Sequence, residues 1–541
     1  MDGTRATAIP DGFWRSDGPA ARGTLAAVGV LALLFLAANL TRDFQVGDEG
    51  VALVDAERIA RGQVPHADFF EIVPPGSFLP TALAFKLLGP TVLAGRLPLL
   101  FYGLLLIAGV DLLLRRLTEN RWLRAAAALF LIPCGVNYWL VPSHHWAVDV
   151  AQLFALAALA RGLDGEHPLL WGALSGALMA AGFFCLQDQG AYLVAGTGAL
   201  VLPWVPERPR RWRLCAGWAA GGLLVAGGFA LWLLPRVSPA ELWYQWALFP
   251  ASRYKGIPGN QGGLLKGWAT VWGSYGWRGL KASPVYASSA LALNGALTLL
   301  PLGAAAGLAW TALGRKVPRP QALALAVGAL AFAGGCAHRW SLVNLAWAAP
   351  GLLVPAAGAL GWALASDRRA LRAAARGLAG VVALSSAAWV GAHAAGVARG
   401  PVARAVTPAG AYWSRGVEEA RALESEVAAV AARVPEGKPL FCRGFVPLFN
   451  FLTRRPPPSR FNYLGYPAYH TESQRNEVVS LLERTPECRV LAVLPLEKGN
   501  AFDDFLLAHY RPLWNDGRVV LLGRVVQEPE VPDAAEGRVG T

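Results

Sequence analysis

Two adjacent carboxylates, Asp48 and Glu49, follow the first long apolar stretch of the chain, in the sequence Val46-Gly47-Asp48-Glu49-Gly50. A carboxylate held beside a hydroxyl group can remove its proton, and such general-base catalysis contributes about 10²- to 10⁴-fold to a rate. The pair is therefore a candidate for base catalysis. Acidic residues are also favoured at helix N-termini, so helix capping is the structural alternative.

Basic side chains occur in two other regions outside the long apolar stretches. Arg253 and Lys255 lie in a loop rich in Trp and Tyr, and His338 and Arg339 follow a later apolar stretch. In a transfer reaction whose leaving group is a phosphate, cations stabilise the negative charge that develops on that phosphate. These four residues are our candidates for phosphate binding. The alternative is that they anchor helix ends at the membrane interface.

Two adjacent histidines, His144 and His145, precede Asp149. Histidines near a carboxylate could hold a metal ion, but adjacent residues do not point to the same face of a helix. A polar contact with one of the two substrates, the group donor or the group acceptor, or packing at the membrane interface, fits these histidines better. Asp68 and Glu71 are further candidates for contact with the donor or the acceptor substrate. The sequence indicates no metal site and no P-loop, so we expect no cofactor, although a divalent ion is compatible with the chemistry.

The composition shows which elements must position these residues. The 541-residue chain is 54% hydrophobic and 16% charged, whereas soluble domains carry about 25% charged residues. Its 21 tryptophans exclude a low-complexity chain. The net charge of +13 comes from 49 basic and 36 acidic residues, and the arginines form short clusters between apolar runs. This pattern favours membrane topology over nucleic-acid binding.

A membrane-spanning helix needs about 20 apolar residues, and stretches approaching that length recur over the first 400 positions. We therefore predict an all-α polytopic membrane domain over 1–397 with about eleven transmembrane helices. The predicted spans are 24–40, 92–114, 124–140, 145–160, 168–186, 190–205, 214–234, 285–312, 321–337, 342–364 and 377–397.

The connecting loops predict the orientation of these spans. Short loops rich in Lys and Arg stay in the cytoplasm, and alternate loops carry the arginine clusters. The prediction is a multi-pass protein of the bacterial inner membrane with a cytoplasmic N-terminus and an uncleaved first span. Its C-terminal part then lies outside the cytoplasm.

Three segments on the outer side are long enough to carry chemistry, namely 41–91, 235–284 and the part that begins at 398. Alternating helix and strand patterns predict a small α/β domain over 398–527, followed by a disordered tail, 528–541. The predicted elements are helices at 415–433 and 473–484, strands at 439–442 and 489–494, and a hairpin at 513–524. The cysteines of this domain, Cys442 and Cys488, can form a disulfide or stay separate thiols.

The segment after the first span resembles the GT-C superfamily of polytopic glycosyltransferases. The resemblance rests on Asp48-Glu49, Pro74-Pro75-Gly76, Phe85-Lys86-Leu87-Leu88-Gly89 and Arg96-Leu97. It is strongest toward the bacterial branch related to protein mannosyltransferases and aminoarabinose transferases. Residues 448–457 and 510–514 also look similar to C-terminal segments of bacterial members.

This resemblance implies a membrane glycosyltransferase that moves a sugar, with inversion, from a polyprenyl-phosphate donor to an acceptor at the outer face of the membrane. Asp48 matches the catalytic acid of the family and is assigned as the general base, with Glu49 as the second candidate. Aminoarabinose transferases have a lysine before the Pro-Pro pair, where this chain has Ile72-Val73, which counts against aminoarabinose as the sugar. A lipid, a polysaccharide or a protein hydroxyl is the expected acceptor.

Two other functions compete with this interpretation. A lipid or sugar transporter or flippase would show inverted repeats and ionisable residues near the bilayer midplane, and neither is evident in the sequence. A catalytically inactive relative that acts as a scaffold is the second alternative. The expected partners beyond substrate and acceptor are membrane lipids, and no nucleic acid is expected.

Overall fold

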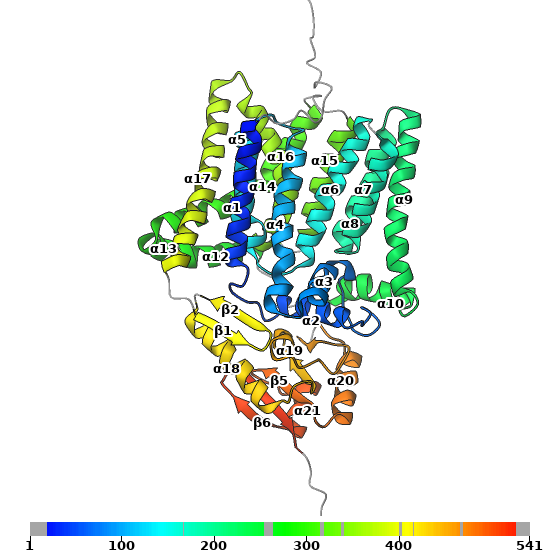
Figure 1. The fold of residues 1–541 in the computed structure, drawn as a ribbon, viewed down its shortest axis with the longest axis vertical. Helices are drawn as coiled ribbons and strands as arrows, with labels where there is room; N and C mark the ends of the chain where they lie inside the picture. Colours follow the sequence, from blue (N-terminus) through cyan, green and yellow to red (C-terminus); the bar gives the residue numbers. More distant parts are fainter. Residues whose placement is uncertain are drawn as a thin grey trace, which may run out of the picture.

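The computed structural model describes residues 19–165, 167–253, 263–313, 319–336, 340–399, 403–414, 416–465 and 469–525. Long helices stand side by side in a bundle, and a small domain of strands and helices lies against one end of it (Figure 1). The tail predicted to be disordered, 528–541, lies outside the described residues.

Each predicted span overlaps a helix of the bundle, although the helices at 124–140 and 190–205 end early, at Cys134 and Gly196. The bundle helices are α1 Pro19–Asn39, α4 Val92–Leu114, α5 Arg121–Cys134, α6 His144–Asp164, α7 Pro168–Phe183, α8 Gln187–Gly196, α9 Arg208–Leu233, α14 Pro284–Leu313, α15 Arg319–Cys336, α16 Leu342–Leu364 and α17 Arg369–Arg399. Among the described residues, six helices are long and apolar enough to cross a membrane, namely α4, α6, α9, α14, α16 and α17. The chain is thus a multi-pass membrane protein, and the total of eleven spans stays a prediction.

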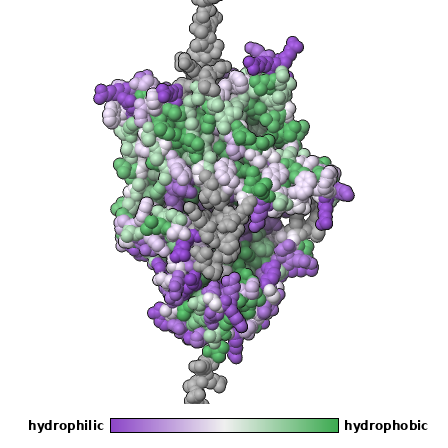
Figure 2. All heavy atoms as spheres, turned by 180° about the vertical axis from the view of Figure 1, so that it is seen from behind, coloured by the Kyte–Doolittle hydropathy of each residue, from purple (hydrophilic) through white to green (hydrophobic). Residues whose placement is uncertain are grey.

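The surface of the bundle has the polarity that a membrane requires. Figure 2 shows apolar side chains over its sides and hydrophilic side chains at the far end and on the C-terminal domain. Small residues let neighbouring helices approach closely. At Gly176 of α7, an added Cβ atom would lie 1.9 Å from the backbone oxygen of Trp218 in α9, so only glycine fits this crossing.

Several arginine-rich connections meet at one end of the bundle. Arg116, after α4, pairs with Asp164 at the end of α6 at 2.6 Å, and Gln321 of α15 donates to the same carboxylate at 2.6 Å. Arg319 lies 3.4 Å from the ring centre of Trp204, which precedes α9. The connections that share the arginines therefore lie together, as their alternation predicts. That this end faces the cytoplasm stays a prediction.

Short helices lie at the opposite end of the bundle, and α2 and α3 among them lie between the bundle and the C-terminal domain (Figure 1). They are α2 Asp48–Ala60, η1 Pro75–Ser77, α3 Leu79–Leu88, η2 Val136–Tyr138, α10 Pro239–Trp243, η5 Tyr244–Leu248, α11 Phe249–Arg253, α12 Gly263–Tyr275 and α13 Trp277–Ala282. The predicted outer segments 41–91 and 235–284 supply most of these elements, and both lie at the same end of the bundle as the C-terminal domain.

The C-terminal region folds as a small α/β domain. Its five-stranded sheet has the order β4-β3-β5-β7-β6, with β3 parallel to β4 and β5, and β7 antiparallel to β5 and β6. The strands are β3 Leu440–Arg443, β4 Tyr463–Leu464, β5 Arg489–Val493, β6 Tyr510–Asn515 and β7 Val519–Arg524, and the helices are α18 Val417–Arg433, α19 Leu448–Thr453, α20 Glu472–Arg484 and α21 Ala501–His509. The predicted helices, strands and hairpin are all present.

An additional hairpin, which no local sequence pattern predicted, precedes this sheet. Its strands, β1 Ala403–Thr407 and β2 Gly410–Ser414, are antiparallel. Trp413 of β2 exchanges backbone hydrogen bonds with the segment after α1: its N–H donates to Thr41 at 2.8 Å, and its oxygen accepts from the N–H of Asp43 at 2.8 Å. Residues far apart in sequence thus share a short stretch of sheet. The domain boundary near residue 398 remains a prediction.

The two cysteines of this domain are separate, buried thiols. The Cys442 thiol donates to Oδ1 of Asn450 at 3.0 Å. The sequence left open whether these two cysteines form a disulfide or stay separate. In the structure Cys442 and Cys488 are separate thiols.

A buried ion-pair cluster connects the C-terminal domain to the membrane domain. Nε and Nη2 of Arg96 in α4 donate to the two carboxylate oxygens of Glu49 in α2 at 2.6 and 2.8 Å. The hydroxyl of Tyr412 in β2 donates to the same carboxylate at 3.1 Å. The Arg96 and Glu49 side chains are 1% and 0% exposed. Three elements therefore meet at one fully buried charge pair.

The same arginine also fixes the turn that leads into α2. Its Nη1 donates to the backbone oxygens of Leu40 and Arg42 at 3.1 and 2.6 Å, and its Nη2 donates to that of Asp43 at 2.9 Å. Bidentate pairing with a carboxylate uses the planar guanidinium in a way that lysine cannot reproduce. Arg96 thus holds both ends of the connection that carries residues 40–49.

Replacing Arg96 by methionine tests this arrangement. Removing one partner of a buried pair leaves an uncompensated charge and costs about 3–5 kcal/mol, so we expect R96M to lower the free energy of unfolding by this amount, measured by denaturant unfolding in detergent.

The matched control is Arg61→Met, because Arg61 pairs with Glu57 while its side chain is 54% exposed. We expect that change to cost about 0–1 kcal/mol. The double variant R96M/E49Q should recover part of the loss. Equal effects of R96M and R61M would show that the buried pair does not hold the structure together.

Candidate functional site

Asp48 and Glu49 have different surroundings in the structure. Both lie in the first turn of α2, and Gly47 is the N-cap without a side-chain cap. The Glu49 carboxylate is buried in the ion-pair cluster and also accepts from the N–H of Gln45 at 3.0 Å. The Asp48 side chain is exposed at the start of the helix. The geometry therefore gives Glu49 a structural role and leaves Asp48 facing outward.

The start of α2 packs directly against the C-terminal domain. An added Cβ atom at Gly50 would lie 2.2 Å from the backbone nitrogen of Leu448 in α19, so only glycine allows this close approach. The N–H of Leu448 donates to the oxygen of Val46 at 3.2 Å. The segment that bears Asp48 is thus fixed from the membrane side by Arg96 and from the domain side by α19.

A buried pair of carboxyl groups, Asp55 and Glu71, lies next to this segment. They lie close enough for each to shift the pKa of the other, and Asp55 Oδ1 accepts from Nδ2 of Asn462 in the C-terminal domain at 2.6 Å. Burial and the nearby charge of Glu71 raise the pKa of Asp55 well above its ordinary value. Burial, with a smaller contribution from the charge of Asp48, also raises the pKa of Glu71. We conclude that the pair shares a proton, because two adjacent buried carboxylates cannot both ionise readily.

Of the two carboxyl groups, Glu71 has more hydrogen-bond donors that stabilise its ionised form. Its Oε1 accepts from the backbone N–H groups of Ile72 and Val73 at 2.7 and 3.1 Å, and both interactions favour the ionised form. The structure therefore brings Glu71, one of the predicted contact residues, within electrostatic reach of Asp48.

Arg58 connects α2 to the C-terminal domain. Its guanidinium donates to Oδ1 of Asn462 at 2.8 Å, to the oxygen of Ser459 at 3.1 Å and to the oxygen of Asp68 at 2.8 Å. The Asp68 carboxylate accepts from the N–H of Val64 at 2.6 Å. The side chain of Asp68, a predicted substrate contact, thus stabilises the turn at residues 64–68. Its backbone oxygen helps to position Arg58.

The second outer segment supports Glu71 from the other side. Oε1 of Gln245 in η5 accepts from the N–H of Glu71 at 3.1 Å and lies 2.9 Å from Nδ1 of His66. Nε1 of Trp246 donates to Nε2 of His66 at 3.0 Å, so Nδ1 of this histidine carries the proton. Burial lowers the pKa of His66 to about 4, and the ring is therefore neutral at pH 7. Segments 41–91 and 235–253 form one hydrogen-bonded unit.

The predicted phosphate ligands are described only in part. Arg253 ends α11, one turn after Phe249, whose ring packs on Phe70 with ring centres 4.9 Å apart. Arg253 therefore lies on the same side of the molecule as Glu71. Lys255, His338 and Arg339 lie outside the described residues, so their assignment stays a prediction.

The histidine pair is placed at the N-terminus of α6. Ser143 caps this helix through the N–H of His145. The His145 ring stacks on Trp347 with centres 3.6 Å apart and planes 13° apart, and it also contacts His144 at 4.3 Å. No group of three His, Cys, Asp or Glu side chains that could hold a metal occurs among the described residues. These contacts favour the packing interpretation.

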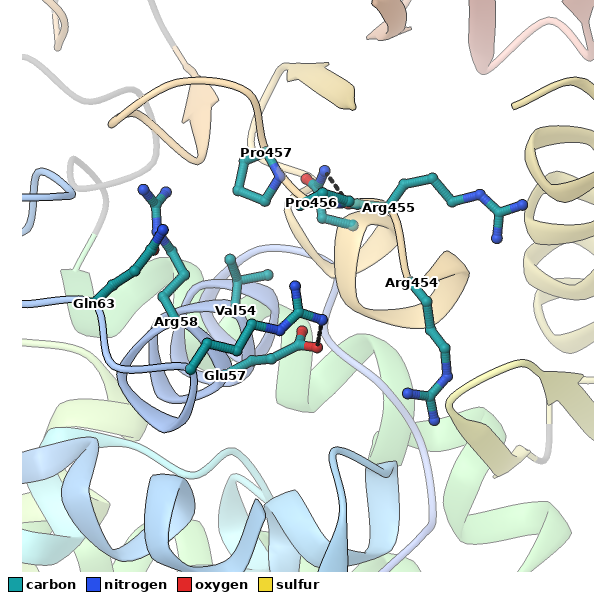
Figure 3. A pocket seen from close by; sticks show the side chains of 10 residues that line it. Val54, Glu57, Arg58, Gln63, Arg454, Arg455, Pro456 and Pro457 are labelled. Atoms are coloured by element: carbon teal, nitrogen blue, oxygen red, sulfur yellow. Dashed lines mark hydrogen bonds and ion pairs between the residues drawn. The ribbon is translucent and has the colours of Figure 1, made fainter. Parts of the chain in front are cut away.

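A cleft of about 50 Å³ separates α2 from residues 450–457 (Figure 3). Four arginines line it. Two of them reach across to the other domain: Arg58 donates to Oδ1 of Asn462 at 2.8 Å, and Arg454 donates to the backbone oxygen of Pro90 at 3.3 Å. The other two bind within their own domain, Arg61 to Glu57 at 2.5 Å and Arg455 to the backbone oxygen of Val434 at 2.9 Å. Figure 3 shows Arg454 and Arg455 extending away from Glu57. We therefore regard the cleft as an interdomain joint.

The sequence pattern indicated no site role for Asp55, Arg58 or Asn462. One signal was available: Asp55 follows Asp48 by seven residues, which places both on nearly the same face of a helix. Nothing local indicated Asn462, because its partner lies 407 positions earlier.

The carboxyl pair predicts a specific pH dependence of stability. Because folding raises the pKa of Asp55, the folded state keeps a proton that the unfolded chain releases, and the free energy of unfolding falls as the pH rises above about 4. We expect Asp55→Asn to flatten this decline, since an asparagine accepts from Asn462 as the protonated acid does. Denaturant unfolding at a series of pH values measures the effect.

Asp504→Asn is the control, because this carboxylate is exposed in the C-terminal domain. It should leave the pH profile unchanged. A D55N profile identical to that of the unmodified chain would contradict proton sharing by the pair.

No protein-family model matches this chain, and no curated protein sequence matches it. Solved structures do resemble it. ArnT from Cupriavidus metallidurans bound to undecaprenyl phosphate superposes with a TM-score of 0.57 at 16% identity, covering 96% of this chain and 99% of that chain. The oligosaccharyltransferase AglB from Archaeoglobus fulgidus, in complex with an inhibitory peptide and a dolichol-phosphate, has a TM-score of 0.54 at 12% identity, covering 95% and 75%.

The likeness to both structures extends over nearly the whole of this chain. At such low identity the likeness establishes the fold. It confirms the resemblance seen in the sequence at the level of the fold: this chain folds as ArnT and AglB do.

Proposed function

We propose that this chain is a membrane glycosyltransferase that moves a sugar from a polyprenyl-phosphate donor to an acceptor at the extracytoplasmic face of the bacterial inner membrane. Two solved structures with this fold hold undecaprenyl phosphate and a dolichol-phosphate, which supports a lipid-phosphate donor here. The observation that carries the proposal is the exposed carboxylate of Asp48 at the start of α2, which Arg96 holds against the bundle and Leu448 holds against the C-terminal domain.

Asp48 acts as the general base in this proposal. It takes the proton of the acceptor hydroxyl while the hydroxyl oxygen bonds to the anomeric carbon and the bond from that carbon to the lipid phosphate breaks. Attack opposite the departing phosphate inverts the anomeric centre. Glu49 cannot easily share this duty, because its carboxylate accepts from Arg96, Tyr412 and Gln45.

The buried carboxyl pair lies within electrostatic reach of this base, because the charge of Asp48 contributes to the raised pKa of Glu71. The neutral His66 and Gln245 hold the Glu71 backbone without adding positive charge. Arg253, Lys255, His338 and Arg339 are proposed to neutralise the departing phosphate. The lipid, polysaccharide or protein nature of the acceptor is left open.

Substituting Asp48 by asparagine tests the assignment of the base. D48N keeps the size of the side chain and removes its basicity, so we expect sugar transfer to fall by about 10²- to 10⁴-fold. In cells that lack the native gene, the lipid-linked sugar donor should accumulate, and D48N should fail to relieve this accumulation. Mass spectrometry of extracted lipids measures the effect and identifies the donor.

Glu57→Gln on the same helix is the control, because Glu57 lies in the interdomain joint and pairs with Arg61. It should relieve the accumulation as the unmodified chain does. Full activity of D48N would remove Asp48 from the mechanism. Persisting lipid transport without any sugar transfer would favour the flippase alternative.

Arg253→Ala tests the phosphate assignment. Loss of a cation that contacts the donor phosphate should raise the KM for the donor about tenfold, with a smaller change in kcat if the contact forms already in the bound donor. The control is Arg236→Ala, since Arg236 is 58% exposed and lies 3.8 Å from Asp68. Equal kinetics for both variants would contradict a role for Arg253.

A further inference from the structure

A second cavity lies within the membrane domain, away from the candidate site. Its volume is about 340 Å³, which falls in the range of small-molecule sites. It lies between the first half of α9 and the short helices η3 Thr197–Val201 and η4 Leu202–Trp204. Its lining residues are Gly198, Leu202, Pro203, Arg211, Trp212, Cys215, Trp218 and Ala219.

The local backbone explains why this space stays open. The η3 segment is a π-helix that continues α8, and such wider turns occur frequently at functional sites. On the other side, α9 packs tightly on α7 at Gly176. Nε1 of Trp218 lies 3.2 Å from Sδ of Met179 in α7, which holds the indole as a fixed wall.

The polarity of the cavity changes along α9. Arg211 lies near the arginine-rich end of the bundle, and Trp212 follows it with 64% of its surface exposed. Cys215, Trp218 and Ala219 continue the lining toward the middle of the helix. Eight residues of α-helix span about 12 Å. A cation, an interfacial indole and an apolar wall therefore follow one another in the order of a phospholipid headgroup, glycerol region and acyl chain.

The charge around the mouth is strongly positive. The first turns of α9 carry Arg208, Arg210, Arg211 and Arg213. Glu207 pairs with Arg210 at 3.2 Å, and Arg319 lies over the ring of Trp204 beside the same connection. One N–H of Arg211 donates to the oxygen of Pro203 at 3.0 Å, and a guanidinium has five such donors. Basic pockets between membrane helices bind anionic lipid headgroups.

We propose that this cavity binds one anionic phospholipid, with the headgroup phosphate on Arg211 and an acyl chain along Trp218 and Ala219. The site is separate from the proposed glycosyl transfer and does not depend on it. Because α9 is a membrane-crossing candidate with a mostly uncovered surface, the occupant reaches the cavity directly from the bilayer.

The test uses the full chain in lipid nanodiscs and measures tryptophan fluorescence. Bromine on an acyl chain quenches nearby indoles, so brominated phosphatidylglycerol in a phosphatidylcholine background should quench more strongly than brominated phosphatidylcholine at the same content. Trp218→Phe should remove part of this excess. Arg211→Ala should weaken the apparent affinity for the anionic lipid about fivefold, the effect of one cation near a lipid surface.

Arg213→Ala is the matched control, because it removes the same charge from an exposed position on α9 that does not line the cavity. It should retain the preference for the anionic lipid. Ala219→Phe fills the cavity with every charge kept, and it should also abolish the excess quenching. Equal quenching by both lipids, equal effects of R211A and R213A, or unchanged quenching in A219F would overturn the proposal.

Discussion

The ion pair between Arg96 and Glu49 is the interaction on which the outer end of the molecule depends. Both side chains are buried, and each makes several charge-assisted hydrogen bonds. Such a pair is costly to break because a single remaining charge would lie in a dry interior. Its position between α2, α4 and β2 ties the membrane domain to the C-terminal domain. It also fixes the first turn of α2, so the exposed Asp48 is presented from a rigid support.

Much of the fold could be predicted from the sequence because it depends on local properties. Apolar length predicted each bundle helix, and the alternation of arginine clusters predicted which connections lie together. Period-two and helical patterns predicted the C-terminal α/β domain. The β1–β2 hairpin was missed, since Trp413 pairs with residues 41 and 43, and no local pattern indicates such a distant partner.

The candidate site could be predicted only in part, for a physical reason. Residue type and the apolar context indicated Asp48 and Glu71, but the role of a carboxylate depends on what surrounds it. In the sequence Glu49 is as good a candidate for the catalytic base as Asp48. The arginine that pairs with the Glu49 carboxylate, Arg96, lies 47 positions later. The partnership of Asp55 with Asn462 depends on the docking of two domains. Neither long-range contact leaves a local signal.

The most direct test of the central claim is a structure of this chain with bound polyprenyl phosphate, determined by cryo-electron microscopy in nanodiscs. We expect the phosphate at the junction of the bundle and the C-terminal domain, with the Asp48 carboxylate facing the space beside it. A phosphate bound at the arginine-rich end of the bundle, or an Asp48 side chain turned away from the bound headgroup, would show that Asp48 is not the base.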